Sequence, residues 1–162
     1  MRCILRQREL VADHWRQLGD EAGDGDSLIV PLAQLRIDPQ RWHARSGPLG
    51  VCLAPTDRAE ELAAELPRLS LVAVEFPNAG DGRGYSTGRL LRERLGFTGE
   101  LRAVGAGVRH DQVFLLARCG FDALELAPGE DPEAALRALR RYDVGYQPGA
   151  PGVLLRRQRF FA

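Results

Sequence analysis

The sequence predicts an α/β fold of repeated βα units with a mainly parallel sheet, preceded by an N-terminal β-hairpin extension. Two observations indicate this fold. From residue 50 onward, short apolar runs alternate with segments whose apolar residues recur at helical spacing. Glycines and prolines stand between these segments, where turns are expected. Strands joined by single helices lie parallel with right-handed crossovers, so the pattern allows either a partial (β/α) barrel or a doubly wound sheet.

The N-terminal extension, residues 1–49, is predicted to belong to the same domain as the repeats. Residues 3–5 and 10–12 are apolar and flank a short polar turn, which favours a hairpin. A strand is expected at residues 28–30, and Asp38-Pro39 is expected to begin a short helix carrying Trp42. Because no long linker interrupts the chain, we assign a single α/β domain to residues 1–147.

The βα repeats occupy residues 50–147. Strands are expected at residues 51–54, 71–76, 101–104, 123–126 and 144–146. Helices are expected between Asp57 and Pro67, from Ser86 to Leu95, from His110 to Cys119, and after Asp131, with Pro132 at the favoured first position. Gly96 and Gly120 are expected to end the second and third helices in the left-handed conformation. Residues 148–162 are rich in proline and glycine at their start and are assigned to a linker and C-terminal tail.

Composition excludes several classes of protein. The 162 residues carry a formal net charge of zero, so no global field recruits nucleic acid or a membrane. No apolar run approaches the ~18–20 residues of a membrane-spanning helix. The cysteines are odd in number and widely spaced, which indicates a reducing compartment. We therefore expect a cytoplasmic protein without nucleic-acid or membrane partners.

The residue types that the chain lacks restrict its chemistry. All 22 basic residues are arginine, so a lysine Schiff base, a pyridoxal-phosphate anchor and a phosphate-loop lysine are excluded. There is no Cys-x-x-Cys, and the three histidines are scattered along the chain. The sequence therefore identifies no metal site and no cofactor.

The strongest candidate site is a glycine-rich segment over residues 78–87, between an expected strand and an expected helix. Convergent backbone N–H groups and a helix N-terminus bind anions in such loops, and Arg83 adds a guanidinium that suits an oxyanion. The predicted anion-binding residues in this segment are Gly80, Asp81, Gly82, Arg83, Gly84 and Ser86. The alternative is a tight structural turn in which Asp81 and Arg83 pair with each other.

A second loop, residues 105–112, follows the next expected strand and should lie beside the first loop in a parallel sheet. Arg109 is therefore a further candidate anion ligand. Histidine is the residue type suited to proton transfer near neutral pH, which makes His110 a candidate proton carrier. Tyr85 is a second candidate proton donor. The alternative is that Asp111 caps a helix and His110 is a surface residue.

Two motifs resemble a known family. The chain contains Asp81-Gly82-Arg83-Gly84-Tyr85-Ser86 and, further on, Arg118-Cys119-Gly120-Phe121-Asp122. Phe76-Pro77, the arginine-rich stretch from Arg89 to Phe97, and the stretch from Gly99 to Gly105 extend the similarity. From about Ile29 to Gln147 the chain resembles the bacterial domain-of-unknown-function family nine-three-four, often labelled a probable oxidoreductase involved in sulfite reduction. It departs from the family at Ala106-Gly107-Val108, where members usually carry an acidic residue.

The resemblance implies a role in assimilatory sulfite or nitrite reduction, because members are typically encoded beside the reductase haemoprotein. We expect an accessory protein that binds a small oxyanion or the reductase itself. Two alternatives remain open: a small oxidoreductase or acid/base enzyme that uses the same loops, and a non-catalytic interaction scaffold. Self-association is also expected, because a short open sheet leaves edges to cover.

Overall fold

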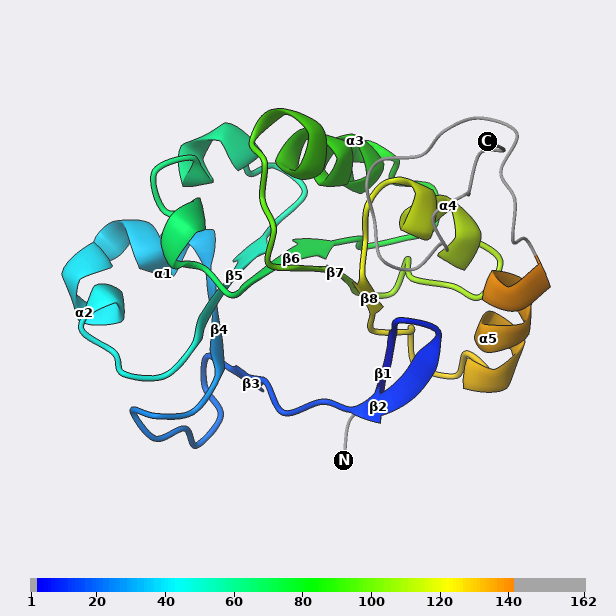
Figure 1. Ribbon diagram of the computed structural model, residues 1–162, viewed down its shortest axis with the longest axis horizontal. Coiled ribbons are helices and arrows are strands. Elements are labelled where there is room, and N and C mark those ends of the chain that lie inside the picture. The colour runs from blue at the N-terminus through cyan, green and yellow to red at the C-terminus, as the bar shows by residue number, and fades with distance from the viewer. Residues whose placement is uncertain (1–2, 142–162) are drawn as a thin grey trace, which may run out of the picture.

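The computed structural model describes residues 3–141, which form a mixed α/β structure on one eight-stranded sheet (Figure 1). The strands are β1 (Cys3–Arg6), β2 (Glu9–Ala12), β3 (Arg16–Gln17), β4 (Leu28–Pro31), β5 (Leu49–Leu53), β6 (Leu71–Glu75), β7 (Glu100–Val104) and β8 (Ala123–Leu124). Their order across the sheet is β2-β1-β8-β7-β6-β5-β4-β3. The six strands from β3 to β8 are parallel; β1 pairs antiparallel with β8, and β2 pairs antiparallel with β1 at the edge of the sheet.

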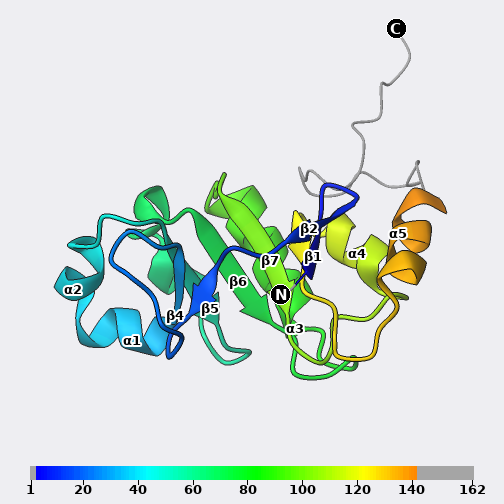
Figure 2. The same ribbon diagram turned by 90° about the horizontal axis from the view of Figure 1, so that it is seen from below.

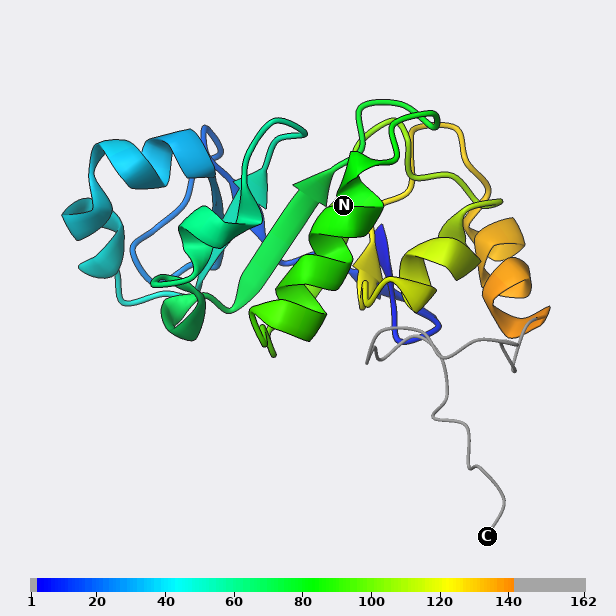
Figure 3. The same cartoon turned by 90° about the horizontal axis from the view of Figure 1, so that it is seen from above.

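The helices cover one face of the sheet. They are α1 (Leu32–Ile37), α2 (Pro39–His43), the short helices η1 (Ala59–Leu62) and η2 (Leu66–Arg68), α3 (Arg83–Arg89), its π-helical continuation η3 (Leu90–Arg94), α4 (Val113–Arg118) and α5 (Pro132–Arg141). Figure 3 shows α1, α3 and α4 lying over the strands on the same side. The main core lies between these helices and the sheet, with Val30, Val51, Val72 and Leu101 contributed by four adjacent strands.

The order of the strands decides between the two sheets that the sequence allowed. A doubly wound sheet reverses its strand order at a switch point and places helices on both faces. Here β3 to β8 follow one another without reversal, so every right-handed crossover adds its helix to the same face. The sheet is therefore a curled partial (β/α) barrel, and the doubly wound alternative is wrong.

The predicted N-terminal hairpin is confirmed. Its two-residue turn, Gln7-Arg8, has φ values of 51° and 65°, the positive angles of the turn type whose twist matches a tight hairpin. Strand β2 lies at one edge of the sheet, with Glu9 and Leu10 exposed. Self-association through such an edge stays a prediction, which light scattering of the protein in solution tests.

The N-terminal segment also covers the face of the sheet that the helices leave open. Figure 2 shows it crossing in front of the central strands. Trp15 packs there against a small cluster of Ile29, Leu71 and Ala73. Its ring fits because residue 50 is glycine; a Cβ at Gly50 would lie 3.1 Å from Trp15 Cζ3. The segment thus supplies the apolar cover that the absent half of a full barrel would otherwise provide.

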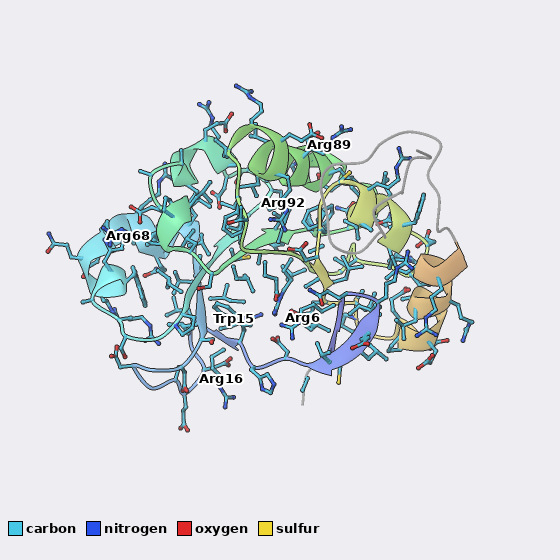
Figure 4. All side chains as sticks on the ribbon, viewed as in Figure 1. Arg6, Trp15, Arg16, Arg68, Arg89 and Arg92 are labelled. Carbon is cyan, nitrogen blue, oxygen red and sulfur yellow. The ribbon has the colours of Figure 1, made fainter. Side chains whose placement is uncertain are left out.

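A buried ion pair fastens this cover to the sheet. Arg102 of β7 donates to both carboxylate oxygens of Asp13 at 3.0 Å, and each side chain is 1% exposed. Arg102 also bonds to Glu100 Oε1 at 2.7 Å. In Figure 4, Trp15 and Arg6 lie on the side of the segment that faces the sheet, whereas Arg16 points away from it.

Several predicted element boundaries are wrong. The helix expected between Asp57 and Pro67 is two short 3-10 helices, because the Asp57 carboxylate accepts from Ala54 N in a local turn and does not cap a helix. Helix α3 begins at Arg83, three residues before Ser86. Helix α4 begins at Val113 and not at His110. Strand β3 and helix α1 were not predicted, and the strand expected at 144–146 lies outside the described residues.

The predicted helix ends at Gly96 and Gly120 are confirmed. Gly96 and Gly120 have φ values of 66° and 97°, so both stand in the left-handed conformation that ends a helix. Asp131 Oδ1 accepts from Glu133 N at 2.9 Å, as expected of the residue before α5. None of the helices within residues 3–141 combines the length and apolarity that a membrane crossing requires.

Candidate functional site at the carboxyl-end rim

Three loops follow the carboxyl ends of β6, β7 and β8 and lie side by side at one edge of the sheet (Figure 3). We call them, together with Arg83 at the start of α3, the carboxyl-end rim, defined as residues 77–83, 105–112 and 125–131. Gly107 N donates to Phe76 O at 2.8 Å, and Gln112 Nε2 donates to Ala79 O at 3.0 Å, which joins the first two loops. The third joins them through Ala127 N, which donates to Val108 O at 2.9 Å. The two loops predicted to be neighbours are therefore neighbours.

The first loop satisfies its polar groups internally. Arg83 donates to both carboxylate oxygens of Asp81, from Nε at 3.0 Å and from Nη2 at 2.6 Å, and its backbone N–H donates to Asp81 Oδ1 at 3.1 Å. These bonds lower the pKa of Asp81, chiefly through the side-chain bond from Arg83. Gly80 N donates to Asn78 Oδ1 at 3.0 Å. This is the geometry of the structural-turn alternative, with the Arg83 guanidinium already engaged.

Two glycines of this region are required by packing. A Cβ at Gly84 would lie 2.4 Å from Phe76 Cζ, and a Cβ at Gly88 would lie 2.5 Å from Phe121 Cε2. The rings of Phe76 and Phe121 meet edge to face at 5.6 Å beneath α3. The small residues on α3 therefore let the helix approach two aromatic rings, a role that needs no ligand.

The second and third loops form a cluster around Glu130. His110 Nδ1 lies 2.6 Å from Glu130 Oε2, and His110 N donates to the same oxygen at 2.8 Å. Arg109 Nε lies 3.4 Å from Glu130 Oε1. These partners lower the pKa of Glu130, chiefly through the backbone bond from His110. The Glu130 side chain is 13% exposed, whereas that of His110 is 47% exposed.

This geometry assigns the two nitrogens of His110 different roles. A carboxylate 2.6 Å from Nδ1 holds a proton on that nitrogen, so Nε2 is left on the solvent side to accept or donate one. A histidine oriented by a carboxylate is the usual arrangement for proton transfer. Sequence reasoning selected His110 but missed Glu130, which lies 20 residues away in the chain. The available clue was the position of Glu130 in the turn after the strand expected at residues 123–126, just before Asp131.

The predicted anion ligands Arg83 and Arg109 do not converge on one shared group in this structure. Arg83 pairs with Asp81, and Arg109 pairs with Glu130. Asp111 adds a further carboxylate on the rim, with its side chain 65% exposed. Gly82 precedes α3 and has open space where a Cβ would stand, and Ser86 is exposed on the first turns of the helix. Their assignment to anion binding stays a prediction.

Tyr85 is anchored by its ring and not by the rim loops. It is half-buried on α3 and packs edge to face against Phe76, with ring centroids 5.1 Å apart. Burial raises the pKa of its phenol. A raised pKa makes Tyr85 a weaker proton donor than an exposed tyrosine, so His110 is the better candidate of the two.

Much of the arginine-rich stretch holds the fold together. Arg92 donates to the carbonyl oxygens of Phe97, Gly99 and Gly120 at 2.6, 2.9 and 3.0 Å, and it pairs with Asp122. Asp122 also accepts from Leu101 N at 3.0 Å. Figure 4 shows Arg92 beneath α3, whereas Arg89 lies on its outer surface, where it pairs with Glu93 at 3.0 Å. Gly120, Phe121 and Asp122 of the second motif therefore have structural roles.

The buried thiols are poorly suited to chemistry. Burial raises the pKa of Cys52 to about 12, and burial also raises the pKa of Cys119. A thiol with a raised pKa carries little of the reactive thiolate. Within residues 3–141, no three histidine, cysteine or acidic side chains cluster in a way that would hold a metal ion.

A search of curated proteins finds no match for the chain. The model of a family described as bacterial protein of unknown function, DUF934, matches residues 50–153. The match begins at β5 and not near Ile29, so the N-terminal cover of the sheet lies outside it, and it continues past Gln147. Because it includes both motifs and well over half of the sequence, the chain belongs to this bacterial family of unknown function, DUF934.

Proposed function

We propose that the chain is an accessory protein of assimilatory sulfite or nitrite reduction, and that it docks on the reductase haemoprotein through the carboxyl-end rim. The biological context rests on the family resemblance of the two motifs. The choice of docking over small-molecule binding rests on the rim itself, where arginines pair with carboxylates and hydrogen bonds join the three loops.

The observation that carries this proposal is the internal pairing of the rim. Small-molecule sites are concave and largely apolar with a few convergent polar groups. The rim arginines are already paired with Asp81 and Glu130. Exposed charges of both signs on a firm surface suit the polar contacts of a protein partner, since they steer association and set its orientation.

The sequence also suggested a second ligand for the same rim, a small oxyanion in place of the reductase. It would require Arg83 and Arg109 to exchange their carboxylates for the anion. The side chain of Arg83 is 60% exposed and that of Arg109 is 50% exposed, and exposed ion pairs contribute little to stability. Calorimetry with sulfite and with sulfate tests this alternative, because it predicts binding that Arg83→Ala abolishes.

Docking is tested by co-purification of the chain with the reductase of the same bacterium. We expect the double charge reversal Arg83→Glu and Arg109→Glu to abolish co-purification, because it places repulsive charges at both ends of the rim. Arg94→Glu is the matched control, since Arg94 is an exposed arginine at the C-terminal end of η3, whereas the rim adjoins the N-terminal end of α3. Full retention of the reductase by the double variant would show that the rim is not the docking surface.

A second candidate function is proton transfer by His110, favoured by the 2.6 Å contact with Glu130. In this reading the protein is a small oxidoreductase or acid/base enzyme, with Arg83 or Arg109 as the anion clamp. Turnover of sulfite by the isolated protein with added flavin or nicotinamide, lost in both His110→Gln and Glu130→Gln, would support it. Turnover that survives both substitutions would exclude this pair from the reaction.

A further inference from the structure

A pocket of about 270 Å³ opens at the amino ends of β5 and β6, the edge of the sheet opposite to the carboxyl-end rim. Leu49, the first residue of β5, and Ser70, which precedes β6, lie in its wall. The remaining wall comes from α2, from the loop that follows it, and from η2. We call it the amino-end pocket, and its lining residues are Trp42, His43, Arg45, Ser46, Gly47, Pro48, Leu49, Arg68 and Ser70.

The charge of the amino-end pocket differs from that of the rim. Arg45 and Arg68 line it, and no aspartate or glutamate does. Neither arginine makes an ion pair with any residue in the described part of the chain, in contrast to Arg83 and Arg109. Two carboxylates engage residues of the wall, Asp24 through Ser46 and Glu65 through His43, but neither forms an ion pair with Arg45 or Arg68. Both guanidinium groups therefore have donors available to an anion.

The loop that carries Arg45 is held in place by backbone contacts. Arg45 Nη2 donates to the carbonyl oxygens of Gly23 and Asp26 at 3.0 and 2.8 Å. Arg45 Nε is buried and finds no acceptor among the described residues, so the protein does not use all the donors of this group. Gly47 lies so close to the acidic loop that a Cβ there would stand 2.5 Å from Asp26 O. The charged group is therefore positioned by the fold before any ligand binds.

Further donors surround the two arginines. Ser70 contributes a hydroxyl whose neighbouring backbone groups are already used, the N–H by Leu49 O and the carbonyl by Glu100 N. His43 also lies in the wall, but its Nε2 is engaged by Glu65 at 2.6 Å, so it is not counted among the donors. Arg68 is exposed on η2 at the end of the molecule near α1 and α2 (Figure 4). Donors thus come from three separate segments, which suits an acceptor with oxygens in several directions.

We propose that the amino-end pocket binds a tetrahedral oxyanion, either free or as the head group of a small phosphate or sulfate monoester. The anion compensates Arg45 and Arg68, which pair with its oxygens, and Ser70 supplies an additional donor. The volume of about 270 Å³ is several times the ~30 Å³ that one water occupies, so it also accommodates a short organic group beside Pro48 and Leu49. This site is independent of the docking proposed for the rim.

The test is a titration of the ¹⁵N-labelled full chain followed by amide chemical shifts, at constant ionic strength. The probes are inorganic phosphate, inorganic sulfate and glycerol 3-phosphate, with acetate as the planar comparison. We expect saturable shifts of the amides of Ser46, Gly47 and Ser70 with the tetrahedral probes. Tighter binding of glycerol 3-phosphate than of phosphate indicates a monoester, and equal binding indicates the free ion.

Arg68→Gln is the informative variant, because Arg68 is exposed and has no partner to lose within the described residues. We expect it to weaken binding by about tenfold to hundredfold, as for loss of a charge-assisted hydrogen bond. Arg140→Gln, at an exposed arginine of α5, is the matched control and should bind as the unaltered chain does. Unchanged binding by Arg68→Gln, shifts confined to residues 80–86 and 105–110, or no saturable shift at all would each overturn the proposal.

Discussion

Replacing Gly84 by alanine tests whether the glycines of the first motif serve packing or ligand binding. Gly84 lies in the first turn of α3, directly over the ring of Phe76. Gly82, two residues earlier, precedes the helix with φ −83° and ψ −6°, angles that alanine adopts, and a Cβ there meets nothing within 4 Å. The two positions therefore share a motif but differ in the space around them.

The expected magnitude follows from the distances at Gly84. Its added Cβ would lie 2.4, 2.6 and 2.9 Å from three atoms of the Phe76 ring, so the ring must move by about 1 Å to reach ordinary contact. Phe76 is 1% exposed and is wedged between Tyr85 and Phe121, which leaves little room for that movement. Overpacking costs about 1–3 kcal/mol, and the tight enclosure of Phe76 places this substitution in the upper part of that range, at about 2–3 kcal/mol. The better helix propensity of alanine offsets about 1 kcal/mol of it. We expect a net loss of about 1–2 kcal/mol.

Thermal unfolding followed by circular dichroism measures this difference. For a chain of this length, a loss of about 1–2 kcal/mol lowers the Tm by roughly 2–8 °C. Gly82→Ala should leave the Tm unchanged or raise it slightly, because alanine reduces the entropy of the unfolded chain. An unchanged Tm in Gly84→Ala would refute the packing role assigned to Gly84, and an equal loss in both variants would indicate a shared backbone requirement in the loop.

Three further predictions concern the rest of the molecule. Asp13→Ala leaves the buried Arg102 with Glu100 alone, so urea unfolding should show a loss approaching the ~3–5 kcal/mol of a broken buried pair. Glu130 has a lowered pKa in the fold, so its stabilising contribution is complete above its ordinary value of 4.5 and is lost as the pH falls through the lowered value. The Glu130→Gln variant should therefore lose stability less steeply than the unaltered chain in acid. In native protein at pH 8, a thiol reagent should label the exposed Cys3 well before the buried Cys119 and the high-pKa Cys52.

At the rim, the sequence predicts which loops are neighbours but not which of their side chains pair. Placing residues 78–87 and 105–112 side by side needed only the rule that consecutive parallel strands end at the same edge. Which side chains meet there was beyond that rule. The pairing of Arg83 with Asp81 was open as an alternative, and the pairing of His110 with Glu130 depends on a third loop whose path the sequence does not specify.

The amino-end pocket, in contrast, could not be predicted from the sequence at all. Its lining residues come from α2, the loop after it, η2 and the start of β5. None of them forms a recognisable motif, and Arg45 and Arg68 are 23 positions apart. Only the packing of these segments against one another reveals that two arginines with no ion-pair partner among the described residues share one concavity.

Local patterns in the sequence alone determined the class of the fold, because apolar periodicity, glycine helix stops and the hairpin signal act over a few residues. They placed the hairpin, the strands from β4 to β8, and the ends of α3 and α4 near Gly96 and Gly120. The tertiary structure decided the winding of the sheet, since strand order depends on contacts between distant segments. It also decided that Asp13 and Trp15 cover the open face and that Gly84 and Gly88 accept aromatic rings. The tertiary structure likewise gives the rim arginines carboxylate partners, whereas those of the amino-end pocket form no ion pair within residues 3–141. Each of these features depends on contacts between side chains that are far apart in the sequence, and local sequence patterns do not specify such contacts.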